Sequence, residues 1–286
     1  MTAFMAEVRS KRLVKERNIA FATRCNFFKE KYATFVASQP LHAILPGVAD
    51  FATMPEFKAI LENPDPEATV TAEDFNIGDD KLLQFSARWR EEKDNALVGI
   101  LRQSSLGSSA SKELLTRATT VFNCRSCSVP ISYPRILAHT CNYVRSMETP
   151  DPSNIFERLR ADPWNLGGDR ISFHEAAHKR AKYILKALNL DHDTTVETMN
   201  EQNPFVECFC ALCYRPGTVR TFARWNRMVS SIHHFPCLRT NNQIDRTYTS
   251  LYQRTRASAL RTCRRTQDGP CEEARSSGAG EASEGP

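Results

Sequence analysis

The stretch FNCRSCSVPISYPRILAHTC, residues 122–141, holds three cysteines and one histidine in a pattern typical of zinc-binding proteins. Cys124 and Cys127 are separated by two residues, so a tight turn can point both thiolates at one ion. His139 follows at a spacing like that of a Cys2His2 finger, and Cys141 comes two residues later. Positions two apart on a continuous helix project about 200° apart. Cys141 can therefore join His139 on one metal only if the helix ends near His139.

These four side chains are the predicted ligands of a structural zinc site, because zinc favours a tetrahedron of sulfur and nitrogen ligands. The alternative is a pair of reduced, buried cysteines with an unrelated histidine. Ile131 and Leu137 lie near the positions of the two core residues of a finger. A finger that reads DNA has arginine, asparagine or glutamine at the start of its helix. Only Arg135 meets that condition, so we do not expect specific DNA recognition.

A second cysteine-rich segment, ECFCALCYRPGT, covers residues 207–218. Cys210 and Cys213 have the same spacing as the first pair, and His233 lies at the end of the helix that is predicted to follow. These three residues are predicted ligands of a second zinc ion. A tetrahedral zinc ion requires four such ligands. The fourth ligand is left open, and three residues are in reserve for it: Cys208, His234 and Cys237.

The composition of the 286 residues, with 41% hydrophobic and 25% charged side chains, is that of a soluble globular protein. No apolar run approaches the ~20 residues that a membrane helix needs. The first residues are charged and lack the apolar region of a secretory signal, so we expect an intracellular protein, cytoplasmic or nuclear. In that environment the ten cysteines are metal ligands or buried thiols rather than a disulfide framework.

Hydrophobic periodicity predicts a mainly α fold, in which a helical N-terminal module precedes a small α+β region with irregular zinc-finger-like segments. The helical module spans 1–103, a polar linker 104–117, the Cys/His-rich region 118–238, and a mostly disordered tail 239–286. The module opens with one long helix over 2–37. Its basic residues are typical of a solvated helix face. The predicted apolar stripe of this helix comprises Val8, Val14, Ile19, Ala22, Phe27, Phe28, Tyr32 and Phe35.

Residues 174–178, His-Glu-Ala-Ala-His, match the HExxH signature of zinc peptidases. In such an enzyme His174 and His178 would bind zinc from one helix face, and Glu175 would be the general base. Glu197 lies at a distance along the chain that suits a third ligand. This peptidase is the alternative function.

Helix capping accounts for both glutamates without any metal. Ser172 stands three residues before Glu175, and Thr194 three residues before Glu197, which is the spacing of a capping box. His174 would then lie in the frayed first turn of a helix, a poor place for a rigid ligand. We therefore favour capping, and a protein that is not an enzyme.

The order of the motifs resembles a large family of uncharacterised proteins of mushroom-forming fungi. The resemblance covers residues 10–235 and is carried by the stretch 122–141, by DPWN, by LDHDTTVETMNEQNPFVECFCALC and by a downstream tryptophan. Many relatives have an F-box at the amino terminus, which this chain does not show, and residues after Phe235 depart from the family pattern. The resemblance implies no reaction. We expect a protein-interaction or adaptor-like protein, with other proteins as partners and one or two structural zinc sites.

Overall fold

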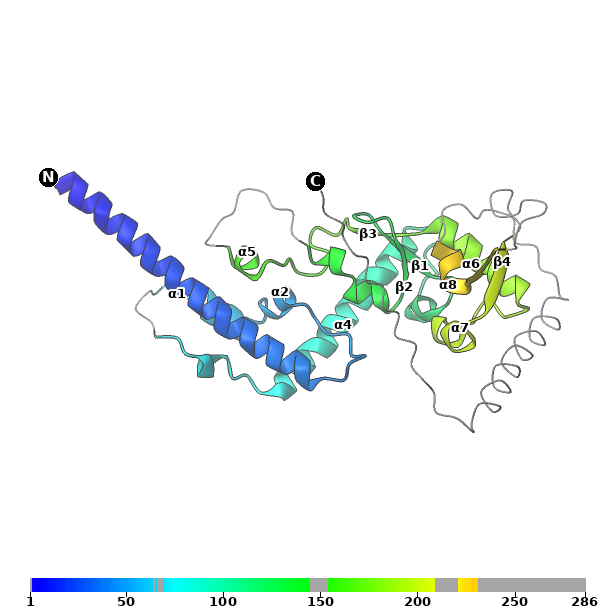
Figure 1. The fold of residues 1–286 in the computed structure, drawn as a ribbon, viewed down its shortest axis with the longest axis horizontal. Coiled ribbons are helices and arrows are strands. Elements are labelled where there is room, and N and C mark those ends of the chain that lie inside the picture. Colours follow the sequence, from blue (N-terminus) through cyan, green and yellow to red (C-terminus); the bar gives the residue numbers. More distant parts are fainter. Residues whose placement is uncertain (1, 64, 66–68, 145–153, 209–220, 231–286) are drawn as a thin grey trace, which may run out of the picture. The chain divides into compact units, whose positions relative to one another are not determined.

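The computed structural model describes residues 2–63, 65, 69–144, 154–208 and 221–230 (Figure 1). All of these residues belong to one compact unit. They form a mainly helical fold with two small antiparallel sheets, which confirms the predicted fold class. The predicted tail at 239–286 lies outside the described residues, and so do Cys210, Cys213 and His233.

The N-terminal helices pack around a cluster of aromatic side chains. The long helix α1 (Thr2–Ser38) confirms the predicted first helix, and the elements that follow it are α2 (Val48–Phe51), α3 (Pro55–Leu61), η1 (Ala72–Phe75) and α4 (Asp79–Arg102). Phe28 is buried at the centre, with its ring centroid 4.9 Å from that of Phe57 and 6.2 Å from that of Phe75. Burial of large aromatic side chains stabilises such a core without any other link.

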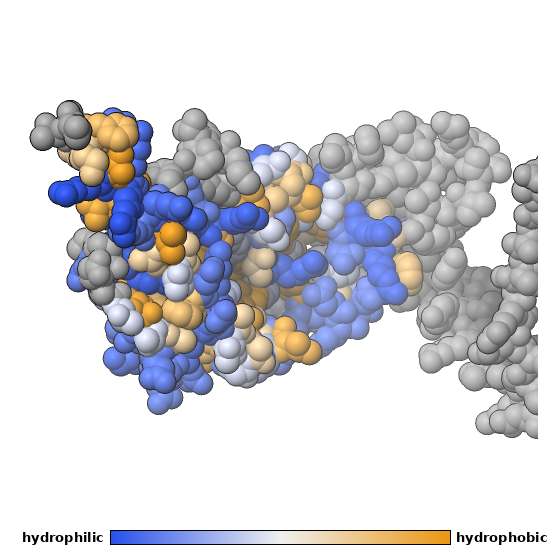
Figure 2. All heavy atoms as spheres, turned by 60° about the vertical axis from the view of Figure 1, so that its left-hand side comes forward, coloured by the Kyte–Doolittle hydropathy of each residue, from blue (hydrophilic) through white to orange (hydrophobic). Residues whose placement is uncertain are grey.

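The predicted apolar stripe of α1 is wrong for the first half of the helix. Val8, Val14 and Ile19 are exposed, and Figure 2 shows the hydrophobic side chains at that end scattered between hydrophilic ones. The buried apolar residues of α1 are Phe21, Cys25, Phe28 and Phe35, so the predicted stripe is confirmed at Phe28 and Phe35. A residue of a helix is buried where another element packs on it. Among the described residues, other elements pack on the second half of α1 only.

The middle of the chain forms a three-stranded sheet against the second half of α4. The central strand β1 (Val121–Cys124) pairs with β2 (Pro130–Ser132) on one side and β3 (Ile171–Phe173) on the other. Phe122 is fully buried and stands opposite Ile131 in β2 and Phe173 in β3. Short helical turns complete this core: η2 (Lys112–Thr116), η3 (Arg135–Ala138) and η4 (Thr140–Asn142).

The last described elements form a separate cluster beside the sheet. They are α6 (Glu175–Ala187), α7 (Val196–Gln202), the hairpin of β4 (Phe205–Cys208) and β5 (Thr221–Arg224), and α8 (Trp225–Ser230). Trp225, Ile184 and Met199 are buried together in this cluster. The cluster joins the sheet region through Ala118, whose N–H donates to the carbonyl of Thr194.

Packing crosses the predicted linker at 104–117. Helix α5 (Ile155–Leu159) follows the linker in the chain but packs on α1, and Lys29 Nζ donates to the carbonyl of Arg158 at 2.7 Å. The buried Asp50 of α2 accepts a hydrogen bond from the Trp164 N–H at 3.1 Å. Burial raises the pKa of Asp50, and the Trp164 N–H partly offsets this rise. Residues on both sides of the linker therefore share buried contacts. The division into two modules stays a prediction.

Candidate metal centre

A tight turn at the end of β1 positions the first two cysteines. Cys124 is the last residue of the strand and is fully buried, whereas Cys127 is exposed. The N–H of Ser128 donates to the carbonyl of Cys124 at 2.7 Å, and the N–H of Cys124 donates to the carbonyl of Val129 at 3.2 Å. Ser128 has a φ of 57°, a left-handed conformation that reverses the chain. The turn therefore returns Cys127 to the side of Cys124.

The helical segment that carries the other two residues is broken between them. Helix η3 ends at Ala138, its C-cap His139 has an extended backbone with φ −72° and ψ 121°, and η4 begins at Thr140. This break is the condition that the sequence sets for Cys141 to share a metal with His139, and the structure confirms it. Without the break the two side chains would point in nearly opposite directions.

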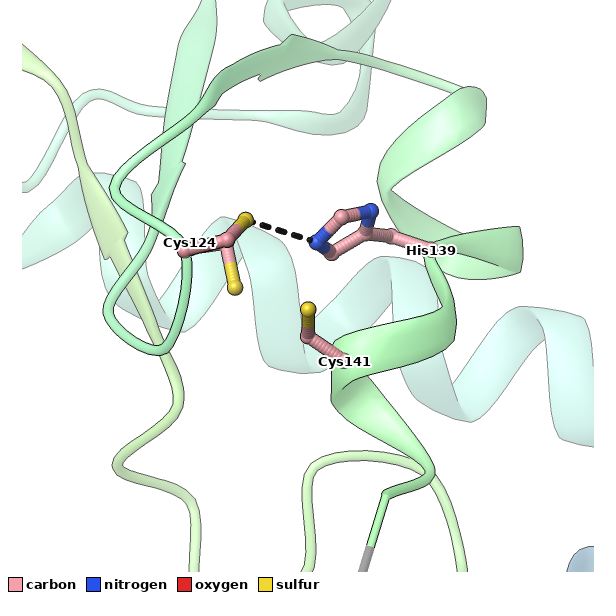
Figure 3. A group of neighbouring side chains, drawn as sticks. Cys124, His139 and Cys141 are labelled. Carbon is pink, nitrogen blue, oxygen red and sulfur yellow. Dashed lines mark hydrogen bonds between the residues drawn. The ribbon is translucent and has the colours of Figure 1, made fainter. Parts of the chain in front are cut away.

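The four predicted ligands of the first site lie together. The Sγ atoms of the three cysteines and a ring nitrogen of His139 all lie within 4.8 Å of one another. Cys127 Sγ is 3.3 Å from His139 Nε2. Figure 3 shows Cys124, His139 and Cys141 pointing toward one centre. Ligand atoms on a tetrahedral zinc ion are about 3.3–3.8 Å apart, so contraction of the longer separations would close the site around an ion.

The charges of these groups favour a cation. Burial, then hydrogen bonding to Cys127 and Cys124, raises the pKa of Cys141 to about 11. Burial also opposes ionisation of Cys124, but hydrogen bonds from the backbone and side chain of Cys127, from the Ser126 N–H and from the Cys141 side chain together more than offset it, and the pKa of Cys124 is lowered. Burial lowers the pKa of His139, which keeps the imidazole neutral and able to bind a metal. Three thiolates this close repel one another, and a divalent cation would remove that repulsion.

A network of hydrogen bonds fixes the segment that carries Cys141. The buried Asn142 donates from Nδ2 to the carbonyl of Ile136 at 2.6 Å. Its own carbonyl accepts from the Asn165 N–H and from Arg170 Nη1, both at 3.0 Å. Arg170 also pairs with the buried carboxylate of Asp162 at 2.6 Å. Such supporting contacts hold ligands in place before the metal arrives.

The second predicted site lies mostly outside the described residues. Its ligands Cys210, Cys213 and His233, and the reserve ligands His234 and Cys237, lie outside the described residues. Cys208 ends strand β4. The second zinc therefore stays a prediction.

The predicted capping box at the start of the HExxH helix is wrong. Ser172 belongs to strand β3, where it stands opposite Asn123. His174 is the N-cap, and its Nδ1 accepts from the N–H of Ala177 at 3.3 Å. Glu175 accepts instead from the N–H and the Oγ of Ser105, at 3.0 Å and 2.7 Å, and so ties the helix to the 104–117 segment.

The second half of the motif is bound to backbone. His178 is buried, and its Nδ1 lies 2.7 Å from the carbonyl oxygen of Thr119, which requires the proton on Nδ1. Burial lowers the pKa of His178 and also that of His174. Because His174 has the non-helical backbone of an N-cap, the two rings do not start from one regular helix face. Within the part of the chain that the structure describes, neither histidine belongs to a group of three possible metal ligands.

The second predicted capping box is also displaced. Helix α7 is capped by Thr195, whose Oγ1 accepts from the N–H of Thr198 at 3.2 Å, and not by Thr194. Glu197 is exposed on the first turn of α7. One local group escaped the sequence analysis: Asp191, His192 and Asp193 lie together on the surface, as a turn rich in acidic residues often does. Only the run of letters DHD could have indicated it.

Comparison with known proteins gave no match to a family model, to a curated protein or to a solved structure. The resemblance to the fungal family therefore stays a prediction. Within the described residues, no helix has both the length and the apolar character that a membrane crossing requires. The site itself is thus the main source of functional information: three thiols and one imidazole gathered close enough to bind one metal ion.

Proposed function

We propose that the chain is a non-enzymatic interaction protein in which Cys124, Cys127, His139 and Cys141 hold a structural zinc ion. The observation that carries this proposal is that their four ligand atoms lie within 4.8 Å of one another. Thiolate and imidazole ligands in a tetrahedral arrangement select zinc over magnesium or calcium, which require oxygen ligands.

The ligand set supports a structural rather than a catalytic role for the metal. Four protein ligands leave a tetrahedral ion without an open position for water or substrate. The ion would join the turn after β1 to the segment at η3 and η4, which are otherwise linked by short strands and single helical turns. Zinc binding supplies on the order of 10 kcal/mol in favourable cases, enough to hold such small elements in place.

The interaction role rests on what the remaining candidate residues do. His174 caps α6, His178 binds the backbone carbonyl of Thr119, and Glu175 binds Ser105. These contacts give each residue of the HExxH motif a use in the fold. The motif order that resembles the fungal family also fits an interaction or adaptor-like protein, with other proteins as partners.

Metal content is the direct test. Elemental analysis of the purified protein should find zinc, and Cys127→Ser or His139→Ala should remove one equivalent. Cys25→Ala is the matched control, because Cys25 is buried on α1 among the aromatic side chains and should leave the zinc content unchanged. A second equivalent that persists in Cys127→Ser would belong to the predicted site at Cys210, Cys213 and His233. Equal zinc content in the parent protein, Cys127→Ser and His139→Ala would refute the first site.

A further inference from the structure

A groove of about 1220 Å³ lies beside the metal centre. One wall is formed by strand β2 and by η3, and the other by β4, β5 and α8. Helix α8 contacts β2, so the two walls belong to neighbouring elements of the same compact unit. The segment 41–44 also lines the groove. His139 and Thr140 lie on the wall, so the groove and the metal centre share residues.

The charged side chains that line the groove in the described part of the chain are arginines. Arg135, Arg224 and Arg227 line it, and among the residues that the structure describes no aspartate or glutamate does. None of the three arginines forms an ion pair with a carboxylate in the described part of the chain. Their positive charges are therefore not neutralised within the groove, and a negatively charged ligand would be attracted to them.

Apolar side chains are exposed between these charges. Val129 is 46% exposed and Phe205 is 58% exposed, and Ile131 is half-buried beside them. The guanidinium of Arg224 lies over the Phe205 ring at 4.9 Å from its centroid. A ligand that fits this lining combines carboxylates with aliphatic side chains, because the first pair with arginine and the second remove Val129 and Phe205 from water.

We propose that this groove binds an acidic peptide segment of a partner protein, with its carboxylates on Arg135 and Arg227 and its aliphatic side chains on Val129 and Phe205. Single-stranded nucleic acid is a poorer fit, because its bases stack on open aromatic rings. Of the aromatic side chains in the lining, Trp225 is buried and Phe205 has one face under Arg224. The proposal names the partner class of the interaction function proposed above, and it rests on that function.

The probe is a fluorescein-labelled peptide of alternating glutamate and valine, and binding is followed by fluorescence anisotropy. Arg227→Glu should weaken binding at least about tenfold, because like charges then face each other. Arg135→Glu should act in the same direction. Arg17→Glu is the matched control, since Arg17 is an exposed arginine of α1 outside the groove and its replacement should leave binding unchanged. Binding should also weaken as salt is raised.

Arg227 also separates this proposal from the metal site. It lies on α8 and is not one of the proposed ligands, so Arg227→Glu should lose the peptide and keep its zinc. Removal of zinc should weaken peptide binding through the shared wall at His139 and Thr140. The purified parent protein could contain no zinc and still bind the peptide in a way that depends on Arg227. That result would refute the metal proposal and leave the groove proposal standing.

Four results would overturn the groove proposal. The first is equal affinity of the parent protein and Arg227→Glu, and the second is equal binding of a peptide with glutamine in place of glutamate. The third is tighter binding of an oligothymidine strand than of the peptide, which would make the groove a nucleic-acid site. The fourth is peptide binding that appears only after deletion of residues 268–286, which carry Asp268, Glu272, Glu273, Glu281 and Glu284. That result would assign the groove to the chain's own acidic end.

Discussion

The N-terminal helices and the region from β1 to η4 reach stability in different ways. The helices bury a group of interlocking aromatic rings, in which Phe28 of the long α1 meets Phe57 of α3 and Phe75 of η1. The region from β1 to η4 has strands of three or four residues and single helical turns. Burial of large rings against a long helix can stabilise the first region, whereas we expect the short elements from β1 to η4 to gain further stability from an additional link. The cluster of three cysteines and one histidine lies in the second region.

The largest effect is expected from loss of the proposed metal site in the second region. Cys124→Ser should remove the zinc, and residues 118–144 should lose protection from hydrogen exchange, because a site that contributes on the order of 10 kcal/mol is lost. The helices α1 and α3 should keep their protection, since their aromatic core does not include the ligands. Hydrogen exchange followed by mass spectrometry measures both regions in one experiment. Uniform loss of protection across the chain would show that the two regions are not stabilised separately.

The converse change affects the aromatic core. Phe28→Ala should lower the free energy of unfolding by about 3–5 kcal/mol, because Phe28 is fully buried and its removal leaves a cavity. The zinc content should stay at the value of the parent protein. Urea denaturation and elemental analysis check the two outcomes. Val14→Ala is the matched control on the same helix: Val14 is 54% exposed, so its loss should change stability by less than about 0.5 kcal/mol.

The sequence predicts that Cys124, Cys127, His139 and Cys141 lie together, and the structure confirms this proximity because its determinants are local. The turn from Cys124 to Cys127 is closed by hydrogen bonds within five residues, and the break at His139 lies between two adjacent helical turns. Spacing alone therefore indicates which side chains can meet. The existence of the long helix α1 is likewise predicted from its own residues, although its apolar face is predicted correctly only in the second half.

The errors concern contacts between residues far apart in the chain. Ser172 pairs with Asn123 in the sheet, and Glu175 binds Ser105, so the local spacing of a capping box was misleading at that helix. The exposure of Val8 and Val14 could not be predicted either, because it depends on which elements pack on α1. Periodicity identifies an apolar face, but it does not show whether a partner covers that face.

The third expected effect is that of pH on zinc affinity. In the metal-free site the pKa of Cys141 is about 11, so this thiol carries a proton at neutral pH and must release it when zinc binds. Zinc affinity should therefore rise with pH, by about tenfold per pH unit for this one proton, and should fall on acidification. Competition with a chromophoric chelator at several pH values measures the slope. Affinity that stays constant across neutral pH would mean that Cys141 is not a ligand.

The smallest effects are expected at the start of the HExxH helix α6, which lies outside the two regions compared above. Ser172→Ala should leave stability nearly unchanged, because Ser172 lies in β3 and does not cap the helix. Glu175→Gln should cost only a few tenths of a kcal/mol, since this carboxylate is solvent-accessible and glutamine can still bond to Ser105. Hydrogen bonding to Ser105 lowers the pKa of Glu175, so the contribution is present at neutral pH and is lost as pH falls through that lowered pKa.

Catalysis gives a separate measurement at the same residues. A zinc peptidase requires Glu175 as general base, so its activity would vanish in Glu175→Gln while the folded protein and its metal remained. We expect no hydrolysis of a peptide library by the parent protein and no change of zinc content in Glu175→Gln or His178→Ala. His178→Ala should still lower stability, because His178 is buried and its Nδ1 bonds to the carbonyl of Thr119. Loss of stability with full zinc content assigns His178 to the fold, whereas loss of zinc together with loss of turnover would assign it to a catalytic site.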